Sequence, residues 1–90
     1  MDCEWDPEKA AANLQKHGVR FSDAALALED PLARTIKDSG SENEDRFVTI
    51  GMDPSGRLVV VVYAHREERI RIISARIAEP RERRNYEASS

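Results

Sequence analysis

The sequence predicts an α+β fold: two N-terminal helices packed on an antiparallel sheet of about four strands, with a short C-terminal helix. The chain has 90 residues, 40% of them hydrophobic and 34% charged, which is typical of one small globular domain over residues 1–90. Helix start and stop signals occupy the first third of the chain and its C-terminal end. Apolar runs separated by turn signals fill the region between.

The first helix follows a short strand that ends at Glu4-Trp5. Asp6 can cap the free amides of a helix start, and Pro7 suits the first helical position. The helix therefore runs from Pro7 to about His17, where Gly18 ends it.

A second helix starts near Phe21 and buries Ala24, Ala25 and Leu28 on one face. Pro31 stops it, because the residue before a proline avoids the helical conformation. We expect both helices to pack on one face of the sheet, which leaves an edge or the other face for the C-terminal helix.

Four strands are expected between the second helix and the last one, over residues 32–37, 46–52, 57–64 and 69–76. In the third, both the odd and the even positions are apolar, which indicates a central strand covered on both faces. A strong turn signal, Asp53 to Gly56, joins the second strand to the third. Because short links join consecutive strands, we expect them to pair antiparallel in chain order.

The segment Arg69–Glu87 contains the pattern that is most informative about function. Arg69 and Arg71 point to one side of their strand and the intervening isoleucines to the other, until Ile73 breaks the alternation. A bulge or a second buried face is needed at that position. Arginine binds phosphate oxygens in forked pairs and stabilises the charge that grows on phosphorus during transfer.

Arg76 ends this strand, and the helix that follows carries Glu82, Arg83 and Tyr86 at spacings of three and four residues. If that helix face turns toward the sheet, the four side chains converge, and Glu and Tyr can move protons. The same spacing fits ordinary surface ion pairs, which are worth little, with Tyr86 as an anchor to the core. The pattern alone leaves both interpretations open.

Other candidates lie elsewhere. His65 ends the central strand beside Arg66, where an imidazole is suited to acid or base catalysis but is also a common turn residue. Arg46 opens a strand and is a candidate phosphate contact. The only cysteine, Cys3, is interpreted as inert and fits a reducing cytoplasm. No metal is expected, because Cys and His are not grouped at metal-ligand spacing.

The net charge of −3 conceals an asymmetry. Residues 1–45 carry five basic and eleven acidic side chains, whereas residues 46–90 carry nine basic ones, all arginine, and six acidic ones. Such asymmetry suggests two surfaces with different roles, although a solvated surface with chance clustering also explains it. The longest apolar run, residues 58–64, is too short to span a bilayer, so we expect no membrane association.

Five segments match one known family and cover nearly the whole chain in order. They are EWDPEKAAANLQKHGVRF (Glu4–Phe21), ALALEDPLA (Ala25–Ala33), DRFVTIGM (Asp45–Met52), LVVVVY (Leu58–Tyr63) and IRIISARIAEPRERRNYE (Ile70–Glu87). In these segments the chain resembles the BrnT family, RelE-like ribonuclease toxins of bacterial type II toxin–antitoxin systems. The resemblance implies a RelE-like fold with a twisted sheet.

The resemblance also implies a metal-independent endoribonuclease, without cofactors, that cuts mRNA and arrests growth. From the SARxAxxxERxxYE motif it transfers catalytic roles to Arg76, Glu82, Arg83 and Tyr86. His65 is a further acid or base candidate. The candidates for binding RNA or phosphate are Arg46 (together with Asp45), Arg66, Arg69, Arg71, Lys16 and His17.

In the leading hypothesis the RNA's own 2′-hydroxyl attacks the adjacent phosphate, with Glu82 as base and Tyr86 or His65 as acid. The implied partner is a BrnA-like ribbon-helix-helix antitoxin in a toxin–antitoxin heterotetramer, which reaches operator DNA only through the antitoxin. The alternative is a non-catalytic binding module or co-repressor whose arginines receive an acidic antitoxin segment. The acidic net charge favours this alternative mildly, because proteins that bind bare RNA are usually basic.

Overall fold

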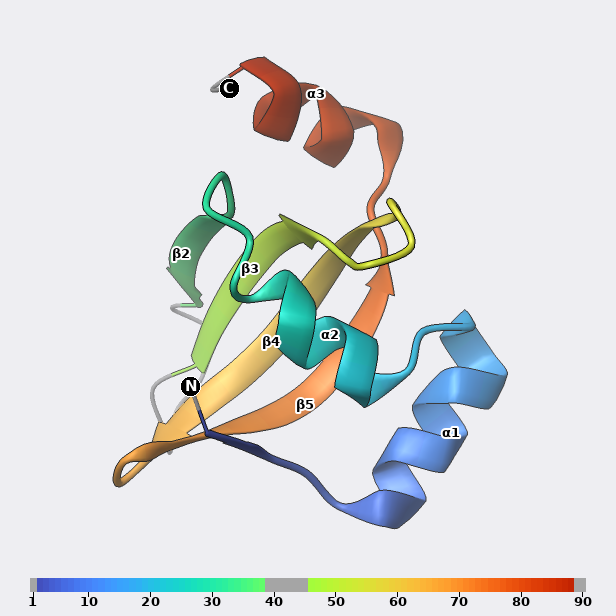
Figure 1. The fold of residues 1–90 in the computed structure, drawn as a ribbon, viewed down its shortest axis with the longest axis vertical. Coiled ribbons are helices and arrows are strands. Elements are labelled where there is room, and N and C mark those ends of the chain that lie inside the picture. The colour runs from blue at the N-terminus through green and yellow to red at the C-terminus, as the bar shows by residue number, and fades with distance from the viewer. Residues whose placement is uncertain (1, 39–45, 89–90) are drawn as a thin grey trace.

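The computed structural model describes residues 2–38 and 46–88, and it holds three helices and five strands in those ranges. In chain order they are β1 (Cys3–Glu4), α1 (Pro7–His17), α2 (Phe21–Ala27), β2 (Arg34–Asp38), β3 (Arg46–Met52), β4 (Leu58–Arg66), β5 (Arg69–Ile77) and α3 (Pro80–Ala88). The helices α1 and α2 lie over one face of the sheet, and α3 lies beyond the ends of the strands (Figure 1). The fold is therefore α+β.

The sheet is mixed, with the strand order β1-β5-β4-β3-β2. Strands β2 to β5 pair antiparallel with their neighbours in chain order. The two-residue β1 pairs parallel with β5, so that Cys3 lies opposite Ile70 and Glu4 opposite Arg71. The sheet thus has five strands rather than about four, because the short strand expected before α1 joins it. Its pairing with β5 depends on tertiary structure, which no local pattern shows.

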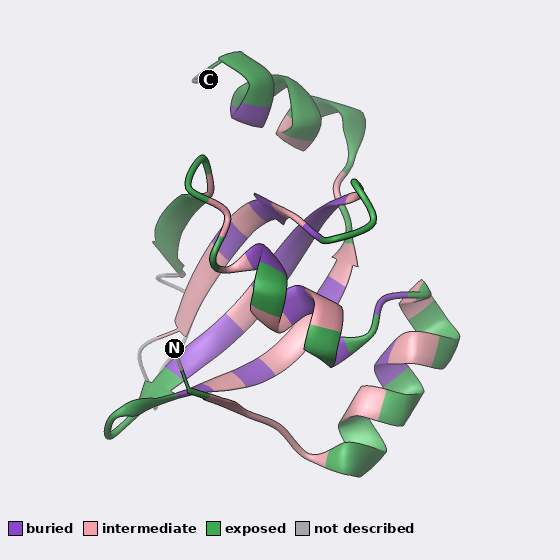
Figure 2. Ribbon diagram, in the orientation of Figure 1, coloured by how far each residue is buried: buried purple, intermediate pink, exposed green. Residues whose placement is uncertain are grey.

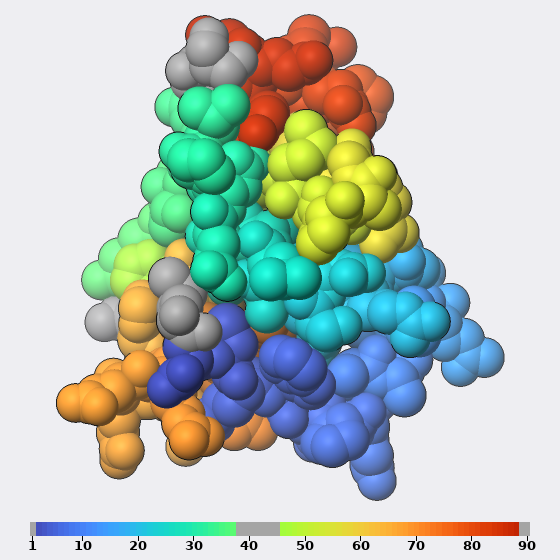
Figure 3. Space-filling view, in the orientation of Figure 1, coloured from blue at the N-terminus to red at the C-terminus, as the bar shows by residue number. Residues whose placement is uncertain are grey.

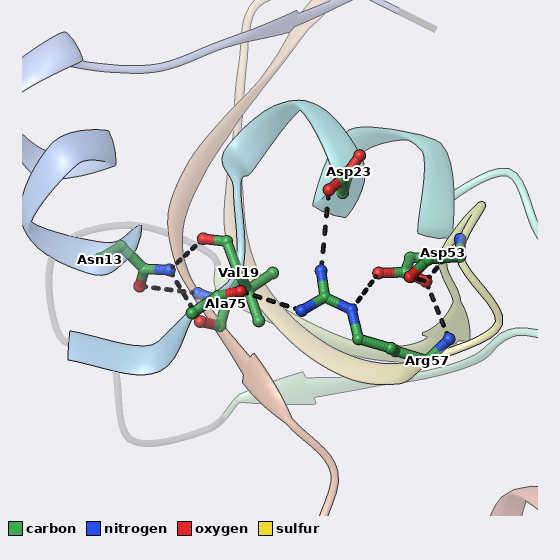
Figure 4. Close-up of polar contacts among 8 residues, drawn as sticks. Asn13, Val19, Asp23, Asp53, Arg57 and Ala75 are labelled. Atoms are coloured by element: carbon green, nitrogen blue, oxygen red, sulfur yellow. Dashed lines mark hydrogen bonds and ion pairs between the residues drawn. The ribbon is translucent and has the colours of Figure 1, made fainter. Parts of the chain in front are cut away.

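The helix α1 begins and ends where the sequence predicts. The side chain of Asp6 accepts a hydrogen bond from the Glu8 amide at 2.8 Å, and Gly18 adopts a φ of 72°, which suits glycine at a helix end. Its buried side chain is polar, however. Asn13 Nδ2 donates to the carbonyls of Val19 and Ala75 at 3.0 and 2.8 Å, and its Oδ1 accepts from the Ala75 amide at 3.1 Å (Figure 4).

The register divides the sheet side chains between two faces. The core lies on the helix face, where Val59 and Val61 of β4 pack with Phe21 of α2 (Figure 2). A register shift between Val62 and Tyr63 leaves Ile73 of β5 outside the pairing. The predicted break in alternation is therefore a β-bulge.

The opposite face of the sheet carries arginines, and we call it the arginine face. The residues on it, by strand alternation and register, are Arg34, Arg46, Arg66, Arg69, Arg71 and Arg76. Arg57 is different, because it joins the β3–β4 turn to the helices. Its Nε donates to Asp53 at 2.9 Å and its Nη1 to the carbonyl of Gly18 at 2.9 Å (Figure 4).

Candidate active site

The centre of the candidate site is a forked ion pair that joins β5 to α3. Nη1 and Nη2 of Arg76 each donate to one carboxylate oxygen of Glu82 at 2.8 Å. The bulge shifts the alternation of β5 by one residue. Arg76 therefore lies on the arginine face, opposite Val60 of β4. The two side chains are 39% and 25% exposed, so a ligand in solution can reach them.

Glu82 also closes the N-terminus of α3. Its Oε1 accepts a hydrogen bond from the backbone amide of Glu79 at 2.8 Å, which is half of a capping box and explains how this helix starts without a Ser or Thr cap. The hydrogen bonds from Arg76 lower the pKa of Glu82, and Glu82 raises the pKa of Arg76 in turn. Both groups are therefore charged at neutral pH.

Tyr86 is buried and anchors α3 to the loop between α2 and β2. Its hydroxyl donates to Oδ2 of Asp30 at 2.6 Å, and the same oxygen accepts from the Met52 amide at 2.8 Å. The bond to Asp30, together with burial, raises the pKa of Tyr86 to about 12. Burial by itself would raise the pKa of Asp30, but the hydrogen bonds from Tyr86, Leu32 and Met52 outweigh it and lower that pKa.

These contacts seat α3 against the loop after α2 and the turn before β4 (Figure 3). A further contact, from Arg34 Nη1 to the carbonyl of Asn85 at 3.0 Å, ties α3 to β2. Beside it lies a groove of about 510 Å³, lined by Arg34, Thr35, Ile36, Val48, Ile50, Glu82 and Asn85. The groove adjoins the Arg76–Glu82 pair, because Glu82 belongs to both.

Within the described residues, the other two catalytic candidates make no contact with the Arg76–Glu82 pair. Arg83 is exposed on α3, one residue after Glu82. His65 lies on the helix face near the far end of β4, where its ring packs edge-on against Phe47 with the centroids 4.9 Å apart. Since Arg76 pairs with Val60, five residues away from His65 along β4, about 17 Å and the thickness of the sheet separate the two positions. His65 therefore lies far from a phosphate bound at Arg76, and its predicted role as the acid there has no geometric support.

The phosphate-contact candidates divide into two groups. Lys16 and His17 end α1, which packs against β5 from the helix face. The remaining candidates, Arg46, Arg66, Arg69 and Arg71, lie on the arginine face at the end away from α3. Asp45, which the resemblance groups with Arg46, lies outside the described residues.

The interpretation of the sequence missed three residues of these surfaces. Asp30 holds Tyr86, Arg34 holds α3, and Glu4 contacts Arg69 and Arg71. Asp30-Pro31 indicated only a helix stop, and Tyr86 lies 56 residues further along the chain. No local spacing links the two.

Within residues 2–38 and 46–88, no group of three or more His, Cys, Asp and Glu side chains is arranged to hold a metal ion. The helices in the same ranges include none long and apolar enough to cross a membrane.

Comparison with known proteins identifies the family. The family model of BrnT, the ribonuclease toxin of type II toxin–antitoxin systems, matches residues 5–82. The crystal structure of the Brucella abortus ribonuclease toxin BrnT is similar, with a TM-score of 0.68 and 26% sequence identity, over 88% of this chain and 97% of that chain. No curated protein matches. The chain belongs to the BrnT family of ribonuclease toxins of type II toxin–antitoxin systems.

Proposed function

We propose that this toxin is a metal-independent endoribonuclease that cuts mRNA through attack of the substrate's own 2′-hydroxyl on the adjacent phosphate. The products are a 2′,3′-cyclic phosphate and a free 5′-hydroxyl. Because the nucleophile belongs to the substrate, no metal is required and DNA is inert. The observation that carries the proposal is the forked pair of Arg76 and Glu82 on the arginine face. Two oxygens of a phosphate can accept the same pair of hydrogen bonds from a guanidinium that the two carboxylate oxygens accept here.

In this mechanism the scissile phosphate replaces Glu82 at Arg76. Glu82 then loses the hydrogen bonds that lower its pKa, becomes more basic and takes the proton of the 2′-hydroxyl. As the new bond from the 2′-oxygen to phosphorus forms and the bond to the 5′-oxygen breaks, Arg76 and Arg83 stabilise the charge on the phosphorane.

Tyr86 has a positioning role in this mechanism rather than the role of the acid. Its hydroxyl is buried and donates to Asp30, and this bond fixes the helix that presents Glu82 and Arg83. The leaving 5′-oxygen therefore takes its proton from solvent.

The test is incubation of the purified protein with single-stranded RNA in excess chelator, with and without ribosomes. Arg76→Ala is expected to slow cleavage by about 100-fold or more. Glu82→Gln keeps an acceptor for the Glu79 amide but loses the base, which lowers the rate by about 10²- to 10⁴-fold. Arg20→Ala, which removes an exposed arginine at the start of α2, is the matched control. Full cleavage by an Arg76→Ala, Glu82→Ala double variant would place the chemistry elsewhere.

A second candidate function is a non-catalytic module that binds an acidic antitoxin segment. One observation favours it: the pKa of Glu82 is lowered and that of Tyr86 raised, so both move away from neutrality in the free protein. Expression in cells discriminates the two. Growth arrest that Arg76→Ala relieves supports the enzyme, whereas unchanged growth with tight antitoxin binding supports the module.

A type II toxin has an antitoxin partner. We propose that this partner is a BrnA-like ribbon-helix-helix protein, that the complex is a cytoplasmic heterotetramer, and that it binds operator DNA only through the antitoxin. We also propose that residues 1–90 form a single RelE-like domain. Light scattering of the purified complex measures the stoichiometry, and an operator mobility shift with the toxin alone tests the route to DNA.

A further inference from the structure

A second group of arginines lies on the arginine face, at the end of the sheet away from α3. Arg66 lies opposite Arg69 in the β4–β5 hairpin, and Arg46 and Arg71 lie on either side of Ala64. We call Arg46, Arg66, Arg69 and Arg71 the distal cluster. All four belong to neighbouring strands of one face, and the residue between Arg46 and Arg71, Ala64, is fully buried.

The distal cluster places like charges opposite each other in one hairpin. Like charges directly opposite each other are unfavourable in an antiparallel pair, and the hairpin turns at Glu67 with a φ of 58°, a conformation strained for a residue with a side chain. Arg66 and Arg69 are exposed, so the core gains nothing from their guanidinium groups. An unfavourable arrangement of this kind is explained if a ligand of opposite charge binds there.

Glu4 neutralises part of this charge, but loosely. Its carboxylate oxygens lie 3.4 Å from Arg71 Nη1 and 3.8 Å from Arg69 Nη1. Each arginine offers one nitrogen at these distances, whereas Arg76 binds Glu82 with two nitrogens at 2.8 Å. Both guanidiniums at Glu4 therefore keep donors for another anion. A hollow of about 560 Å³ opens beside them, lined by Glu4, His65, Arg66, Glu67 and Arg69.

We propose that the distal cluster is a second binding site for the RNA backbone and that Glu4 is a built-in competitor for its phosphate. The proposal rests on the proposed ribonuclease function. Arg71 and Arg76 are about 15 Å apart along β5, and their guanidiniums bind different carboxylates, Glu4 and Glu82, so we expect each to contact a different phosphate. The site therefore holds a phosphate more than one nucleotide away from the bond that is cut, and it does so in any sequence, because guanidinium forks bind phosphate oxygens and not bases here.

Equilibrium binding of a fluorescent 2′-O-methyl RNA oligonucleotide over a range of KCl concentrations tests the proposal without any need for cleavage. An Arg69→Gln, Arg71→Gln variant is expected to bind about tenfold more weakly, and the slope of log affinity against log salt falls by about 0.7 for each phosphate that the variant no longer neutralises. Glu4→Gln has the opposite effect, with affinity raised about two- to fivefold and a steeper slope. Arg20→Gln, which removes one positive charge at the start of α2, is the control.

Equal affinities and equal salt slopes for wild type and the arginine variant overturn the proposal. So does a Glu4→Gln protein that binds RNA as wild type does, an outcome that stays decisive if the double variant loses its fold. If the variants bind RNA normally but bind the antitoxin more weakly, the distal cluster belongs to the interface with the antitoxin. This result also overturns the proposal. If the distal variants change binding but the wild type cuts no RNA with or without ribosomes, the distal site stands and the ribonuclease proposal fails.

Discussion

The hydrogen bond from Tyr86 to Asp30 joins α3 to the loop between α2 and β2. It is short, at 2.6 Å, the phenol is buried, and the acceptor is a carboxylate. Tyr86→Phe removes one oxygen atom and keeps the ring in place. Any loss of stability in this variant therefore measures the hydrogen bond rather than the packing.

The size of the effect follows from the strength of a hydrogen bond to a charged acceptor. A hydrogen bond to a charged group contributes about 1.5–3 kcal/mol. The bond to Asp30, together with burial, also raises the pKa of Tyr86 from 10.0 to about 12. We therefore expect Tyr86→Phe to lower the free energy of unfolding by about 2 kcal/mol, which lowers Tm by roughly 10 °C in a domain of this size.

The pH dependence gives a second readout. A tyrosine whose pKa is higher in the folded state contributes stability that is fully present below pH 10 and is lost as pH rises from 10 to about 12. Urea unfolding across this range should show the loss in the wild type and a smaller one in Tyr86→Phe. Tyr63→Phe, which removes a hydroxyl bonded to Thr49 at 2.9 Å, is the control. A Tyr86→Phe protein as stable as the wild type, with the same alkaline loss, would refute the reasoning.

Three further predictions concern stability. Asn13→Leu leaves the backbone polar groups of Ala75 without a buried partner and should lower unfolding free energy in urea by about 2–4 kcal/mol. Gly51→Ala should lower Tm, because a Cβ there meets the carbonyl of Ala27. Burial alone would raise the pKa of Asp53, but the hydrogen bonds from Ser55 and Arg57 outweigh burial and lower this pKa. The stability that the ionised Asp53 contributes is therefore lost as pH falls below about 4. In Asp53→Asn, the free energy of unfolding in urea should depend less on pH in this acid range.

Local signals were sufficient for the secondary structure. The strand β3 spans the predicted residues 46–52, and α1 begins at Pro7 after its Asp6 cap. Of the two alternatives that the break at Ile73 left open, a bulge or a second buried face, the structure has the bulge. The tertiary contacts were not predictable in this way. Asn13 lies between Ala12 and Leu14 in α1, and only the approach of β5 makes it a buried partner of Ala75.

The candidate site was predictable where its residues are close in sequence. Arg76 ends a strand and Glu82 starts the next helix, so six residues bring them together. The position of His65 relative to them depends on the register of β4 against β5, which the bulge shifts by one residue. Because a shift of one residue exchanges the faces of a strand, the bulge puts Arg76 on the face opposite His65, and the sequence left open whether the break at Ile73 is a bulge.

Both arginine sites hold a carboxylate of the protein where we expect a phosphate of the substrate. Glu82 occupies Arg76 with two short hydrogen bonds, and Glu4 occupies Arg69 and Arg71 with two longer contacts. Binding of RNA is then an exchange of one anion for another, so each arginine adds less affinity than a free one. This arrangement reconciles a net charge of −3 with a nucleic-acid substrate. It also requires that removing a resident carboxylate and removing an arginine change RNA affinity in opposite directions.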